Sequence, residues 1–144
     1  MAMRTLSSTP TIAIFMLLLL ASWESSMATT LVVSNQLVRP HGIVYVRCEG
    51  NWAYEVSKLI PAGSKTSIVV PPNADGTNWP PVVCVGKYSE VSSYRHILYT
   101  STLSGDNKGC KNDRCLVKVT DDGFYRWNEE KKSWDLIPSK IWLP

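Results

Sequence analysis

The sequence predicts an all-β protein: a small antiparallel β-sandwich stapled by two disulfides, following an N-terminal signal peptide. Short segments rich in β-branched and aromatic residues recur between turn residues, as in sandwiches and barrels. No stretch of a dozen residues shows the 3.6-residue period of an amphipathic helix. The four cysteines all follow the apolar leader, and an even number is typical of small secreted domains with disulfides.

The N-terminal leader has the three parts of a secretory signal peptide. Arg4 precedes an apolar run over Ile12–Ala21, and Ser26-Met27-Ala28 places small residues at the cleavage site. A membrane anchor is the alternative, but a span needs about 20 apolar residues and this run has roughly half of that. We therefore expect residues 1–28 to be removed and residues 29–144 to form one secreted, extracellular domain.

The charge of the chain limits its partners. The formal net charge is +3, from 15 lysines and arginines against 12 acidic residues. This excess is too small and too dispersed to favour nucleic acid, although it suits a protein near anionic cell walls or membranes. We expect no cofactor, no membrane insertion after signal cleavage, and a monomer.

Four cysteines, Cys48, Cys84, Cys110 and Cys115, allow three pairings. We favour Cys48–Cys84, which joins two strand-like segments, and Cys110–Cys115, which closes a polar loop. On the loop-entropy model these bonds stabilise the fold by about 4 and about 2 kcal/mol respectively. A zinc site is the alternative, but the one close pair is C-x4-C and no histidine lies near it.

Nine extended segments are expected in the mature part. They are Leu31–Ser34, Ile43–Cys48, Ala53–Leu59, Thr66–Val70, Val82–Lys87, Tyr94–Thr100, Cys115–Thr120, Phe124–Trp127 and Trp134–Ile137. The polar stretch Pro71–Pro81 must form a loop.

Alternation predicts which side chains face the core. Val44, Val46 and Cys48 share one face of their strand and Arg47 faces water. Because Cys84 also faces inward, we expect a cross-core disulfide between the two segments.

The segment after Cys115 predicts a hairpin whose register follows from its hydrophobic pattern. A two-residue Asp122-Gly123 loop would mix polar and apolar side chains on both faces. A three-residue Asp121–Gly123 loop, with a glycine bulge, pairs Val119 with Tyr125 and Val117 with Trp127, and places Lys118 with Arg126 on the other face. We therefore expect the three-residue loop. By the same logic, a four-residue turn over Glu129–Lys132 sets Trp127 opposite Trp134.

These motifs together resemble the plant self-incompatibility S1 family, the S-protein homologues. The C-terminal signature is Cys-x4-Cys followed by LVKVTDDGFYRWNEEKKSWDL, and looser matches are VRCEG at Val46–Gly50, LIPAGSKTSIVV at Leu59–Val70 and VVCVG at Val82–Gly86. The resemblance implies a secreted β-sandwich and, for founding members, a pistil ligand sensed by a pollen receptor. The chain departs from the family pattern where Leu116-Val117 replaces the usual tryptophan, where VV stands in place of an aromatic-rich strand, and in its tail, Pro138–Pro144.

The function we expect is a secreted signalling ligand that binds a cell-surface receptor through its loops. The candidate partner-binding residues lie in two loops and are Asn73, Asp75, Asn78, Trp79, Lys111, Asn112, Asp113 and Arg114. Ser101–Gly109 and Glu129–Lys132 are further candidate loops. The structural alternatives are that Trp79 folds back over the sandwich edge and that the second loop is a solvated turn. The tail residues Ile141–Leu143 either dock on the body or expose an apolar handle.

Two other functions compete with this one. Trp79 beside Asn73, Asp75 and Asn78 would suit a carbohydrate-binding or defence protein. A nuclease would need paired general acid–base groups such as His41 and His96, but these stand in unrelated contexts and we expect them at a turn and on a surface or edge strand. No hydrolase, zinc-protease or phosphate-loop motif occurs, and we expect no enzymatic activity.

Overall fold

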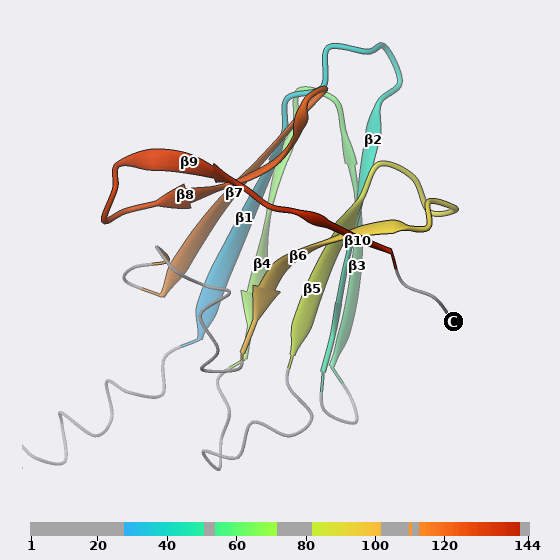
Figure 1. Cartoon of the computed structure of the whole chain (residues 1–144). Coiled ribbons are helices and arrows are strands. Elements are labelled where there is room, and N and C mark those ends of the chain that lie inside the picture. Colours follow the sequence, from blue (N-terminus) through green and yellow to red (C-terminus); the bar gives the residue numbers. More distant parts are fainter. Residues whose placement is uncertain (1–27, 51–53, 72–81, 102–109, 111–112, 142–144) are drawn as a thin grey trace, which may run out of the picture.

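Two five-stranded sheets face each other in this computed structural model, which describes residues 28–50, 54–71, 82–101, 110 and 113–141 (Figure 1). The first sheet has the order β4 (Lys65–Val70), β1 (Thr29–Asn35), β7 (Arg114–Thr120), β8 (Gly123–Asn128) and β9 (Ser133–Leu136). The second has the order β10 (Ser139–Ile141), β6 (Tyr94–Thr100), β5 (Val83–Lys87), β2 (Ile43–Glu49) and β3 (Glu55–Pro61). The described residues contain no helix, so none could cross a membrane.

The all-β sandwich and all nine expected strands are confirmed, but the pairing is not wholly antiparallel. β1 runs parallel to β7, with Val33 opposite Val117. Parallel neighbours need a long connection, and here the chain passes through β2 to β6 between them. The described residues begin at Ala28, so the predicted signal peptide lies almost entirely outside them.

The core lies between the sheets and follows the expected alternation. Val44, Val46 and Cys48 are fully buried in β2, whereas Arg47 is exposed. Phe124 of β8 and Leu98 of β6 are large buried side chains that both lie close to the position a Cβ of Gly86 would occupy.

Both expected disulfides, Cys48–Cys84 and Cys110–Cys115, are present. Cys48 and Cys84 are directly opposite each other on the adjacent strands β2 and β5, with a Cα–Cα distance of 3.9 Å. This bond therefore joins two strands of one sheet, and the expectation that it crosses the core between the sheets was wrong. With every cysteine oxidised, the zinc alternative has no thiolate ligands.

The β7–β8 hairpin has a different register from the expected one. Thr120 pairs with Gly123, so the loop holds only Asp121 and Asp122, and Val119 faces Phe124, not Tyr125. The three-residue loop was therefore wrong, and so was the placement of Lys118 with Arg126. This one-residue slip reverses the faces of β8, because the side-chain period of a strand is 2. Phe124 and Arg126 point between the sheets, whereas Tyr125 pairs with Lys118 on the outer face.

The β8–β9 turn agrees with its prediction. Asn128 pairs with Ser133 across the four-residue turn Glu129–Lys132, and Trp127 lies opposite Trp134 with ring centroids 5.4 Å apart. The Asn128 side-chain oxygen accepts hydrogen bonds from two main-chain N–H groups of the turn, both at 3.1 Å.

The tail supplies a strand that the sequence did not predict. Ser139–Ile141 form β10, which pairs with β6 at the edge of the second sheet. This part of the tail therefore docks on the body, and the side chain of Ile141 stays exposed.

Candidate functional site

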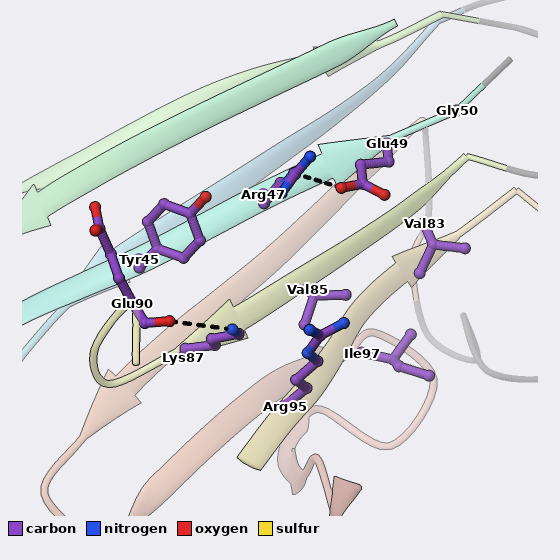
Figure 2. A pocket seen from close by; sticks show the side chains of 10 residues that line it. All are labelled: Tyr45, Arg47, Glu49, Gly50, Val83, Val85, Lys87, Glu90, Arg95 and Ile97. Atoms are coloured by element: carbon purple, nitrogen blue, oxygen red, sulfur yellow. Dashed lines mark hydrogen bonds and ion pairs between the residues drawn. The ribbon is translucent and has the colours of Figure 1, made fainter. Parts of the chain in front are cut away.

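A groove of about 740 Å³ lies on the outer face of the second sheet. Figure 2 shows side chains from β2, β5 and β6 gathered on this face, together with Glu90 from the loop after β5. The two candidate loop residues that the structure describes, Asp113 and Arg114, do not line it.

Strand register explains how these side chains meet. Tyr45 and Arg47 of β2 lie opposite Lys87 and Val85 of β5, and directly opposite residues in an antiparallel pair share a face. Val85 in turn lies opposite Ile97 of β6. The positions that alternate with the buried residues of β2 and β5 therefore form the outer surface.

The middle of the groove is aliphatic, and charged side chains surround it. Val83, Val85 and Ile97 are each half-buried. Arg47 forms ion pairs with Glu49 and with Glu55, the latter at 2.9 Å between Nη2 and Oε1. These pairs are largely exposed, so each contributes at most about 1 kcal/mol.

The opposite end of the groove carries an excess of cations. Lys87 donates a hydrogen bond from Nζ to the main-chain oxygen of Glu90, at 3.3 Å. Arg95 lies opposite Lys140 of β10, and the pairing of Gly86 with His96 sets Lys87 beside Arg95. Three cations therefore form a row across three adjacent strands.

Of the predicted partner-binding residues, only Asp113 and Arg114 lie within the described residues; Asn73, Asp75, Asn78, Trp79, Lys111 and Asn112 lie outside them. Asp113 has a left-handed φ of 55°, and its main-chain oxygen accepts a hydrogen bond from the Thr30 N–H at 2.7 Å. Arg114 is exposed at the start of β7.

The two histidines occupy different environments. His41 is exposed in a turn with a φ of 69°, as expected. His96 is only 8% exposed and stacks on Phe124 with a centroid distance of 4.1 Å, so its expected surface or edge position was wrong. Burial lowers the pKa of His96, and the hydrogen bond between Nδ1 and the Ile137 oxygen partly opposes that shift. His96 is therefore a core residue.

The outer face of the first sheet carries aromatic side chains. The rings of Trp127 and Trp134 are inclined at 64°, and Lys118 Nζ lies 4.5 Å from the Trp134 ring centroid. The rings therefore do not form a flat platform, and the ammonium covers one face of Trp134. Among the described residues, no group of three or more His, Cys, Asp or Glu side chains could hold a metal.

Sequence reasoning placed binding in the loops and missed the groove. The sequence nevertheless held an indication of the groove. In IVYVRCE and VCVGK the polar side chains Tyr45, Arg47, Glu49 and Lys87 alternate with core residues, so they face outward on β2 and β5. Comparisons with known proteins found no matching family model, no matching curated protein and no matching solved structure.

Proposed function

We propose that this protein is a secreted plant signalling ligand of the self-incompatibility S-protein type, and that it binds a cell-surface receptor protein. The leader before Thr29 and the ordered resemblance to S-protein homologues support secretion and the family. The two disulfides also support secretion, because such bonds form and persist in oxidising compartments.

The groove is the observation that carries the binding role. Its side chains project from three paired strands, and β2 and β5 are also joined by the Cys48–Cys84 bond, so little conformational entropy is lost when a partner binds. Tyrosine and arginine, which contribute most to protein interfaces, occupy it as Tyr45, Arg47 and Arg95. The predicted loops, with Trp79 and Arg114, extend the binding surface in this proposal.

A carbohydrate-binding or defence role is the second candidate, and a secreted nuclease or hydrolase is less well supported. Aromatic faces are the usual surface on which sugars stack, but the groove floor is aliphatic and Lys118 covers one face of Trp134. His96 is held in the core, which removes one of the two histidines on which a nuclease would depend.

A cell-binding assay tests the proposal. Labelled, oxidised mature protein is applied to intact plant cells from several tissues, before and after protease treatment of the cells. We expect saturable binding that protease treatment abolishes. The variants Trp79→Ala and Arg114→Ala test the loops and Arg47→Ala tests the groove, while Lys65→Ala, on an edge strand of the first sheet, serves as the control.

Two results would contradict a receptor protein as the partner. The first is an absence of binding on every tissue. The second is binding that survives protease treatment and is competed by free glycans, which would favour the carbohydrate-binding role. Cleavage of added RNA by the purified protein would instead favour the enzyme.

A further inference from the structure

The groove is electrically polarised along its length. At one end Lys87 and Arg95 line the groove and Lys140 lies opposite Arg95 on β10, and Glu90 is the one acidic residue among the described residues that line this end. At the other end, one cation, Arg47, is paired with two carboxylates, Glu49 and Glu55. The aliphatic floor of Val83, Val85 and Ile97 lies between the two ends.

The cationic row brings like charges together on three adjacent strands. Arg95 and Lys140 are directly opposite each other on β6 and β10, and Lys87 follows on β5, only about 5 Å further across the sheet. Like charges directly opposite each other on a sheet are destabilising. An anionic partner placed over this row would face three positive charges.

We propose, resting on the receptor-binding function above, that the groove binds an extended acidic peptide segment of the partner protein. Aliphatic side chains of that segment pack on Val83, Val85 and Ile97, and its carboxylates face Lys87, Arg95 and Lys140. From Val83 to Lys87 the floor measures about 13 Å, the length of about four extended residues. The acidic part lies at the Lys87 end, because Glu49 and Glu55 would repel it at the other.

A peptide fits this floor better than an acidic polysaccharide does. Branched aliphatic side chains bury area against Val83, Val85 and Ile97, whereas the hydroxyl groups of a uronic acid chain would lose their hydrogen bonds to water there. A uronic acid oligosaccharide is therefore the alternative ligand that the experiment must separate.

The test is an NMR titration of isotope-labelled, oxidised mature protein. The probe is a blocked hexapeptide, Val-Val-Val-Asp-Asp-Asp, and its matched control replaces each Asp by Asn. We expect shift changes on β2, β5 and β6 with the acidic probe, and affinity at least about tenfold lower with the Asn control, equivalent to about 1.4 kcal/mol. Raising the salt concentration should weaken binding of the acidic probe.

Variants locate the charge effect. Lys87→Gln combined with Arg95→Gln should reduce affinity for the acidic probe at least about tenfold. The control, Lys65→Gln combined with Lys131→Gln, removes the same charge from other surfaces and should leave affinity unchanged. If the groove variant does not fold, Lys140→Gln, on the exposed edge strand β10, should still reduce affinity severalfold.

Three results would overturn the inference: equal binding of the two peptides, shift changes confined to another surface, or binding of a uronic acid hexamer without binding of the acidic peptide. The groove variant also separates this inference from receptor binding. If the Lys87→Gln/Arg95→Gln variant binds cells as tightly as the wild-type protein, the groove has no role in that binding, and the receptor-binding proposal still stands. If the peptide binds in the groove but the protein binds no cells, the groove inference stands and the receptor-binding proposal is overturned.

Discussion

The guanidinium of Arg126 in β8 donates hydrogen bonds to the main-chain oxygen of Leu98 in β6, at 2.7 Å from Nη2 and 3.2 Å from Nε. Nη2 also reaches the Ile97 oxygen at 3.0 Å. Leu98 is the extra residue of a β-bulge, since Cys84 pairs with Tyr99 and Val85 with Ile97. A bulge leaves main-chain groups outside the ladder, and here an arginine from the opposite sheet satisfies them.

Replacing this arginine should therefore destabilise the fold. Arg126→Met keeps most of the apolar stem but leaves the Leu98 and Ile97 oxygens without these donors, which should cost about 1–3 kcal/mol. Urea unfolding at neutral pH measures the loss. Arg114→Met, at an exposed position, is the control and should change stability by less than about 0.5 kcal/mol. Equal stability of the two variants would show that the cross-sheet hydrogen bonds contribute nothing.

His96 should make stability depend on pH. Its pKa is lowered from the ordinary value of 6.5, so the unfolded chain takes up the proton more readily than the folded protein. The stabilising contribution is fully present above the unfolded-state pKa and is lost as pH falls through the folded-state pKa. The urea concentration at the midpoint of unfolding should therefore decrease as the pH is lowered below about 6.5. His96→Phe, which keeps a ring on Phe124, should show a shallower decline; an unchanged pH profile would exclude His96 as the cause.

Gly86 should not tolerate a side chain. A Cβ at this position would lie 2.6 Å from Phe124 Cε1 and 3.1 Å from Leu98 Cδ1, both in the core. Gly86→Ala should destabilise the protein by about 1–3 kcal/mol through overpacking. The penalty should shrink in a Phe124→Leu background, where the ring is absent. Additive losses in this double-mutant cycle, measured by denaturant unfolding, would contradict a direct steric conflict.

The two disulfides should differ in their contribution to stability. The Cys48–Cys84 bond spans 36 residues and Cys110–Cys115 spans five, so removal should cost about 4 and about 2 kcal/mol on the loop-entropy model. Paired cysteine-to-alanine variants, unfolded in urea, provide the comparison. A larger loss from the short loop would show that loop length does not set the difference.

Local pattern was enough to predict most of the strands and one cross-strand pair. The alternation in β2 predicts the burial of Val44, Val46 and Cys48 because a strand repeats every two residues. Trp127 and Trp134 meet because a short turn leaves few possible registers. The favoured disulfide pairing, one of three that the sequence allowed, was also correct, although the arrangement of Cys48 and Cys84 on strands of one sheet was not predicted.

The register of β8 depended on the opposite sheet. Pattern alone placed Tyr125 and Trp127 with the valines of β7, because that register gathered Lys118 and Arg126 on the other face. Arg126 faces the core side because the bulge at Leu98 supplies carbonyl acceptors there. No residue near Arg126 in the sequence carries that information.

The sequence by itself determined the β class and the inward face of β2, since these depend on composition and two-residue alternation, and it favoured the disulfide pairing that forms. Only the tertiary structure decided the parallel β1–β7 pair, the sheet order and the groove. The row of Lys87, Arg95 and Lys140 joins residues more than fifty positions apart at its extremes, and it exists because β5, β6 and β10 are neighbours. Such neighbours are chosen by the packing of the whole chain, which no local pattern encodes.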